Sequence, residues 1–79
     1  MTTQEFLNLL DEALGLPAGS VGLDGTPETV DAWDSVGQLS ILATIEQQVG
    51  VATNAPDLVN ATSVADLATA LRARGVLED

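Results

Sequence analysis

Four residue types that carry most proton-transfer and covalent chemistry are absent from this 79-residue chain: histidine, cysteine, lysine and tyrosine. A Ser-His-Asp arrangement is therefore impossible, as are disulfides and thiolate-bound metal ions. Among the carboxylates, Asp11 and Glu12 are neighbours, so on a helix their side chains diverge, and we interpret them as part of a solvated face. Most residues used for proton transfer or covalent catalysis are therefore missing, and we predict no catalytic residue and no metal site.

Positive charge is almost absent as well. Arg72 and Arg74 stand against twelve acidic side chains, which gives a formal net charge of −10. Such a chain repels nucleic acid and anionic membranes and favours partners with basic patches. No basic segment precedes an apolar one at the N-terminus, and no apolar run approaches the roughly 18 to 20 residues that cross a bilayer. We expect a soluble, cytoplasmic monomer that binds neither nucleic acid nor membrane.

Aliphatic side chains must supply the core, because Phe6 and Trp33 are the only aromatic residues. Apolar residues at helical spacing, with capping residues at the ends, predict four helical stretches: residues 3–14, 35–49, 56–60 and 64–74. We therefore predict an all-α fold, a four-helix bundle of three longer helices and a short third one. It forms a single domain over residues 1–79, in which residues 75–79 are a loose tail.

The stretch between the first two helices, residues 15–33, has no periodicity and contains several glycines and prolines. A loop of this length in a small domain is usually functional or held by its own apolar residues. We expect Val21, Leu23 and Val30 to hold it against the core.

Ser35 follows this loop at the predicted start of the second helix, with Asp34 as the N-cap residue. The first backbone N–H groups of a helix lack partners inside it, and the macrodipole favours an anion there. A phosphate-bearing group attached to Ser35 would lie in that field. On spacing alone, Asp-Ser before an apolar run is more often an ordinary helix start, so the residues by themselves leave both interpretations open.

The run from Val30 to Leu39, VDAWDSVGQL, resembles the modification site of the acyl carrier protein family, which includes the peptidyl carrier domains. Size, acidity and helix order extend the resemblance over most of the chain. In that family the serine of an Asp-Ser-Leu motif carries a covalent 4′-phosphopantetheine, whose thiol holds acyl groups as thioesters. The resemblance makes Ser35 the modified residue. Val36 departs from the usual leucine, a conservative difference.

The resemblance implies a non-catalytic carrier of acyl or aminoacyl groups. Its partners would be a phosphopantetheinyl transferase, a loading enzyme and downstream synthase or transferase enzymes. Asp34 would support attachment, either by holding the helix start or by binding a metal ion that arrives with the donor, and the sequence does not separate these roles. Because the family's short third helix borders the cleft that shelters an acyl chain, Leu58 and Val59 are candidate cavity residues.

The second helix has more apolar positions than one core-facing side needs. Val36, Leu39 and Ala43 continue round the helix beyond the core-facing stripe, with Glu46 beside them. We expect these four residues to form an exposed apolar strip that partner enzymes contact, the alternative being that they pack under the loop or the third helix. Solvent accessibility of Leu39 and Ala43 decides between the two.

With only one acidic residue, this helix differs from the acidic recognition helix of fatty-acid carriers. The difference favours a stand-alone carrier in a specialised pathway of the polyketide or nonribosomal peptide type, with weaker salt dependence of docking. Trp33 suits such a carrier as a partner-binding residue, although anchoring the loop explains it equally well. The rival hypothesis is an acidic helical adaptor that binds a basic partner without a prosthetic group. A hydrolase is disfavoured by the missing acid-base residues.

Overall fold

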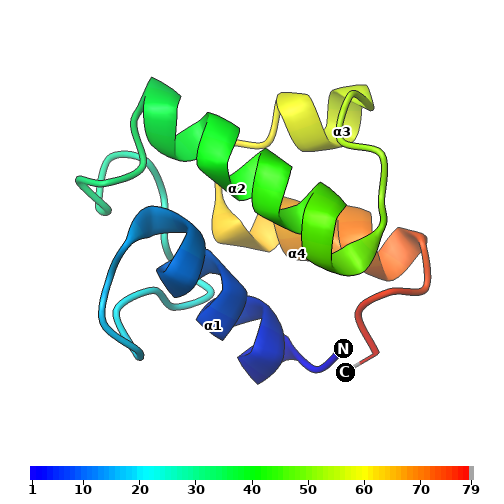
Figure 1. Ribbon diagram of the computed structural model, residues 1–79, viewed down its shortest axis with the longest axis horizontal. Helices are drawn as coiled ribbons and strands as arrows, with labels where there is room; N and C mark the ends of the chain where they lie inside the picture. Colours follow the sequence, from blue (N-terminus) through cyan, green and yellow to red (C-terminus); the bar gives the residue numbers. More distant parts are fainter. Residues whose placement is uncertain (79) are drawn as a thin grey trace.

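The computed structural model describes residues 1–78. Within them the chain forms four helices and no strand: α1 (Thr3–Leu14), α2 (Ser35–Val49), α3 (Pro56–Val59) and α4 (Val64–Ala73). The three longer helices pack around one core, the short α3 lies along one side of it, and Glu78 lies next to Met1 (Figure 1). This confirms the predicted all-α four-helix fold.

The bounds of α1 and α2 agree with the predicted ranges because their ends are set by local caps. The Thr2 hydroxyl accepts from the Glu5 backbone N–H (3.1 Å), and the Glu5 carboxylate accepts from the Thr2 N–H (2.8 Å). Gly15 and Gly50 end the two helices in left-handed conformations, with φ of 70° and 77°. By contrast α3 and α4 each end one residue earlier than predicted, at Val59 and Ala73.

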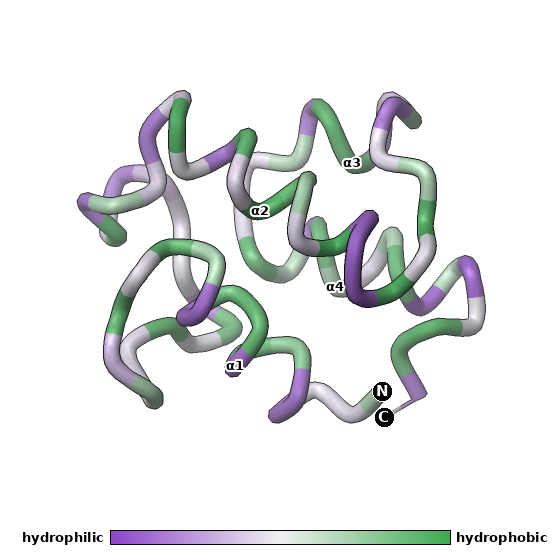
Figure 2. The backbone as a smooth tube through the Cα atoms, in the orientation of Figure 1, coloured by the Kyte–Doolittle hydropathy of each residue, from purple (hydrophilic) through white to green (hydrophobic). Residues whose placement is uncertain are grey.

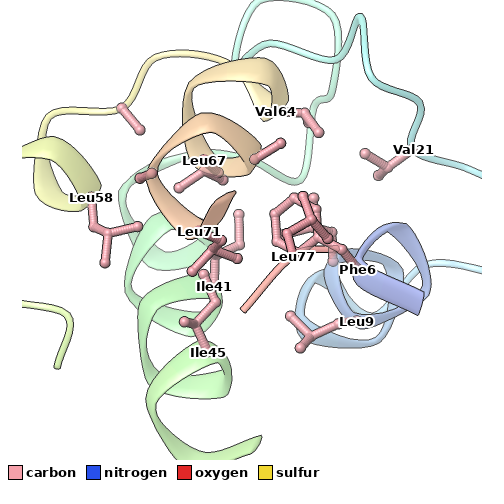
Figure 3. Close-up of a cluster of buried hydrophobic side chains, with 14 of the residues drawn as sticks. Phe6, Leu9, Val21, Ile41, Ile45, Leu58, Val64, Leu67, Leu71 and Leu77 are labelled. Atoms are coloured by element: carbon pink, nitrogen blue, oxygen red, sulfur yellow. The ribbon is translucent and has the colours of Figure 1, made fainter. Parts of the chain in front are cut away.

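The core is largely aliphatic, and its aromatic side chains are Phe6 and Trp33. Apolar positions recur along α1, α2 and α4 with polar positions between them (Figure 2). Figure 3 shows the apolar side chains converging from all the helices. The largest fully buried ones are Phe6, Leu10, Ile41, Ile45, Leu58, Val64, Leu67 and Leu71. Burying such side chains is the dominant favourable term for a domain of this size.

A buried carboxylate holds the start of the first connection. Asp11 is only 2% exposed, and its two oxygens accept hydrogen bonds from the backbone N–H groups of Gly19 (3.0 Å) and Val21 (2.9 Å). The interpretation of Asp11 as part of a solvated face is therefore wrong, whereas its neighbour Glu12 is exposed as expected. The residue type gave no hint of this, because the partners of the carboxylate lie in a loop without periodicity.

The middle of the same connection is held by its backbone. The Gly25 carbonyl accepts from the N–H of Val64, the first residue of α4 (2.9 Å). Gly25 is buried, and a side chain there would meet the Val64 Cγ2 atom at 3.0 Å. Of the three predicted apolar contacts, Val21 is buried and Val30 is partly buried against the core, but Leu23 is 45% exposed, so that prediction is wrong.

The segment after α4 is not the loose tail that we predicted. Leu77 is buried in the core at 4% exposure. The Met1 amino nitrogen lies 2.6 Å from the Val76 carbonyl oxygen, and the Glu78 N–H donates to the Met1 carbonyl (2.9 Å). An apolar side chain at position 77 that reaches the core explains why this segment packs. The part of the tail prediction that concerns position 79 lies outside the described residues.

An ion pair attaches α3 to α4. The Arg74 guanidinium donates to both carboxylate oxygens of Asp57, at 2.7 and 2.8 Å, and also to the carbonyl of Ala70 (2.8 Å). Near the end of α4, Arg74 thus donates to one of the helix's last carbonyls, where a cation is favourable. Its main partner, however, is the carboxylate on α3, which sequence spacing did not reveal.

Candidate functional site around Ser35

Ser35 is the first residue of α2 and is exposed. Asp34 caps the helix, as predicted: its Oδ1 atom accepts from the Gly37 N–H (2.8 Å), and its backbone carbonyl accepts from Gln38 (2.8 Å). Among the described residues, no group hydrogen-bonds to the Ser35 hydroxyl or to the backbone N–H groups of Ser35 and Val36. The hydroxyl is thus accessible, and unpaired amide donors lie beside it at the positive end of the helix dipole.

A close backbone approach holds this helix end in place. Gly37 is buried, and a β-carbon there would overlap the carbonyl oxygen of Ala32 and lie 3.0 Å from the Leu14 Cδ2 atom. The glycine therefore lets the loop and α1 pack directly on the first turn of α2. Sequence reasoning assigned no role to Gly37. Its single signal was a glycine within a helical pattern, which commonly marks such an approach.

An open groove of about 720 Å³ begins at Ser35. Its lining comes from the end of the first connection, the first turns of α2, and the segment from α3 to α4. The lining residues are Pro27, Trp33, Asp34, Ser35, Gln38, Leu39, Val59, Asn60, Ala61 and Thr62. None of them is basic, and the only carboxylate is that of Asp34.

The two candidate cavity residues behave differently. Val59 lines the groove and is 46% exposed. Leu58 is fully buried in the core and does not line the groove, so its role as a cavity residue stays a prediction. The reason is the direction of α3: consecutive helical residues point about 100° apart, so one of the pair faces the core and the other faces the groove.

Trp33 is 4% exposed, and its indole N–H donates to the Gln38 Oε1 atom (2.7 Å). This corrects the expectation that Trp33 offers a surface to partners, because a side chain so deeply buried anchors the end of the loop instead. The anchoring alternative is the one that the structure supports. Gln38, which sequence analysis treated only as an uncharged position, also donates from Nε2 to the Val59 carbonyl (3.4 Å).

The apolar strip is exposed, as predicted. Val36 and Leu39 are 72% and 68% exposed, and Ala43 and Glu46 are exposed as well. On the opposite side of α2, Ile41 and Ile45 are fully buried. The alternative in which the strip packs under the loop or α3 is therefore wrong.

Three ionisable groups outside the groove have shifted titration. Hydrogen bonds from Arg74 hold the pKa of Asp57 below its ordinary value, and the same pairing raises the pKa of Arg74. The Thr62 backbone N–H, helped by hydroxyl groups, lowers the pKa of Asp66. These pKa shifts reflect hydrogen bonds that hold α3 and the start of α4. The groove lining itself contains no basic side chain that could offset the charge of Asp34.

Comparison with protein families matches residues 4–71 to the phosphopantetheine attachment site family. The chain belongs to this family. It is therefore a carrier of the acyl and peptidyl carrier type, and its prosthetic group is a covalent 4′-phosphopantetheine. No curated protein and no solved structure matches the chain. None of the helices within residues 1–78 has the length and apolar content of a membrane span.

The residues present around Ser35 fit this group. A phosphodiester needs an accessible hydroxyl and benefits from unpaired amide donors, and both occur at the first turn of α2. The amides and short apolar segments of the pantetheine need a surface with polar and apolar lining. The groove next to Ser35 has that mixed character.

Proposed function

We propose that this protein carries acyl or aminoacyl intermediates as thioesters on a 4′-phosphopantetheine arm attached to Ser35, and that it catalyses no step itself. The observation that carries the assignment is the exposed Ser35 hydroxyl at the first position of α2, beside unpaired backbone amides, in a chain of the phosphopantetheine family. Carriers of this family act as shuttles for partner enzymes. A tethered thioester raises the effective concentration of substrate at each enzyme that docks.

Attachment requires that Ser35 be presented to a phosphopantetheinyl transferase. The Ser35 oxygen attacks the phosphorus atom of coenzyme A that bears the pantetheine, and a new O–P bond forms. The bond from that phosphorus to the bridging pyrophosphate oxygen breaks, and adenosine 3′,5′-bisphosphate leaves with that oxygen. The hydroxyl proton passes to a base of the transferase. Asp34 supports the step by fixing the first turn of α2 through its hydrogen bond to Gly37.

The apolar strip is the surface that partner enzymes contact. It lies on α2 next to Ser35 and exposes Val36, Leu39 and Ala43, with Glu46 as the single charge. Apolar contact with little charge complementarity predicts docking with weak salt dependence. That property favours dedicated partners in a specialised pathway of the polyketide or nonribosomal peptide type, in which the carrier acts as a stand-alone protein.

Intact mass after incubation with coenzyme A and a broad-specificity phosphopantetheinyl transferase tests the function. We expect the mass to increase by one phosphopantetheine in the wild type, by none in Ser35→Ala, and by one in Ser40→Ala, a control on the same helix. No gain in the wild type would favour the rival hypothesis, an acidic adaptor without a prosthetic group. A gain that persists in Ser35→Ala would assign the arm to another residue.

The apolar strip is tested with the same transferase as a first partner. We expect Leu39→Ser to raise the KM for the carrier by roughly tenfold, because it removes one exposed leucine from the centre of the contact. Gln48→Ser, at an exposed position on another face of the same helix, is the matched control and should leave KM unchanged. Equal KM values for both variants would show that the strip is not the contact surface.

A further inference from the structure

One wall of the groove carries a side chain that is held in a defined orientation. Gln38 lines the groove one helical turn beyond Ser35 and is half-buried. Its side-chain amide lies between the Trp33 indole, 2.7 Å from Oε1, and the Val59 carbonyl oxygen, 3.4 Å from Nε2. The groove wall is therefore organised around one amide group.

The orientation of this amide follows from its partners. An indole N–H only donates, so Gln38 must turn its Oε1 atom toward Trp33. A backbone carbonyl only accepts, so Nε2 must face Val59. Both partners demand the same rotamer of the amide, and neither allows it to flip. The hydrogen bond from Trp33 is short, and the Trp33 side chain is buried. The tryptophan therefore holds the Gln38 amide in one orientation.

Hydrogen-bonding capacity remains on the groove side. The Gln38 amide nitrogen carries two hydrogens, and among the described residues only the Val59 carbonyl accepts from it. That bond is long, at 3.4 Å, and a carbonyl oxygen has a second lone pair. The wall thus presents one N–H donor and one carbonyl acceptor side by side, close to the point where an arm on Ser35 would begin.

The Gln38–Val59 contact is also the weak connection between α2 and α3. It is the only hydrogen bond between these two helices among the described residues. The short α3 is held on its other side by the Asp57–Arg74 pair and packs against α4. A ligand can therefore engage the Gln38 amide and the Val59 carbonyl without displacing α3 from α4.

We propose that Gln38 is a positioning residue for the pantetheine arm, an inference that rests on the proposed function of Ser35. The arm contains secondary amides, each with one carbonyl acceptor and one N–H donor. An arm carbonyl accepts from Gln38 Nε2, and an arm N–H donates to the Val59 carbonyl. The arm then lies along the groove while no partner enzyme is docked, and it leaves when a partner competes for it.

The test uses the protein carrying the arm, with its nitrogen atoms isotopically labelled for NMR. Attachment of the arm should shift the Gln38 side-chain amide resonances, and nuclear Overhauser contacts should connect these protons to the arm. In the wild type, the arm amide protons should exchange with water roughly fivefold more slowly than in free pantetheine, the protection given by about one net hydrogen bond. This measurement needs no variant and is unaffected by folding defects.

The substitution Gln38→Glu removes the side-chain N–H donor but keeps an oxygen that can accept from Trp33. The carboxylate still accepts from Trp33, but it has no N–H for the arm and repels an arm carbonyl. We expect Ser35 to be modified as in the wild type and the protection of the arm amides to be lost, because without the bond from Gln38 to an arm carbonyl the arm is no longer held beside the Val59 carbonyl. Gln47→Glu makes the same charge change at an exposed position of α2 and should keep the protection.

The outcomes distinguish the two proposals. If no arm is attached to Ser35, the proposed function fails. If the arm is attached but its amides exchange as in free pantetheine, or if Gln38→Glu keeps the protection of the wild type, the role of Gln38 is wrong and the function stands.

Discussion

The two connections that flank α2 are held in different ways. The first, residues 15–34, is held by three features. These are the hydrogen bonds to the buried Asp11 carboxylate, the backbone hydrogen bond from Val64 to Gly25, and the buried Trp33 side chain. The second, residues 50–63, contains α3 and is held mainly by buried Leu58, an exposed ion pair and one long hydrogen bond from Gln38. We infer that the first connection holds Ser35 rigidly, and that the second connection, which forms one wall of the groove, is the more mobile of the two.

This difference suits a carrier. Segments with few buried contacts open more easily than those tied into the core. Under the proposed function, Ser35 must hold one geometry for the transferase, and it directly follows the rigid connection. If the groove receives and releases the arm as proposed, at least one wall must move, and α3 is the wall with the fewer anchoring contacts.

The largest expected effect on stability comes from removing the Asp11 carboxylate that holds the first connection. Asp11→Ala leaves the backbone N–H groups of Gly19 and Val21 without their acceptors. We expect the free energy of unfolding to fall by about 2 to 4 kcal/mol, a large share of the stability of so small a domain. Chemical denaturation followed by circular dichroism measures this. Glu12→Ala, at the exposed neighbouring position, is the control, and equal losses in both variants would refute the anchoring role.

A smaller effect is expected where the rigid connection meets α2. In Gly37→Ala the new methyl group overlaps the Ala32 carbonyl, so the loop must move away from the first turn of the helix. We expect a loss of about 1 to 3 kcal/mol and slower modification of Ser35. Gln47→Ala, an exposed position in the same helix, should change neither quantity. If the stability of Gly37→Ala were unchanged, the loop could move away from the helix without destabilising the fold, and the close approach at Gly37 would not matter for stability.

The smallest effect concerns the adjustable connection. Asp57→Asn removes the exposed ion pair with Arg74, and such pairs contribute little, so the melting temperature should fall only slightly. Hydrogen exchange of the α3 amides should accelerate, while that of the α1 amides should not. A large loss of global stability would show that α3 is as firmly held as the first connection.

The pH dependence of this pair has a definite sign. The pKa of Asp57 in the folded protein lies below its ordinary value of 3.8, because Arg74 stabilises the charged carboxylate. The contribution of the pair is therefore fully present above pH 3.8 and is lost as the pH falls through the lower, folded pKa. The melting temperatures of the wild type and Asp57→Asn should converge in that acidic range.

Much of the fold could be predicted because its signals are local. The capping box of Thr2 and Glu5, the N-cap Asp34 and the terminal glycines act within a few residues, so spacing alone located the helix ends. The exposure of Leu39 could be predicted because α2 has more apolar residues than fit on one core-facing side of a helix. These features depend on the order of residues along one helix.

The contacts between distant segments could not be predicted in this way. An aspartate that accepts from a loop eight and ten residues away looks the same in sequence as a solvated one. Leu77 was assigned to a loose tail, although its side chain lies in the core. Gln38 gained its role from Trp33 on one side and Val59 on the other, which only the packed structure brings together.

The sequence by itself determined the four helices, the serine at the start of the second one and the apolar strip beside it, because helical periodicity and capping are short-range properties of the chain. The tertiary structure alone decided how the loop is anchored, which of two adjacent residues on α3 faces the groove, and which amide lines it. Those outcomes depend on the directions in which side chains from separate segments meet.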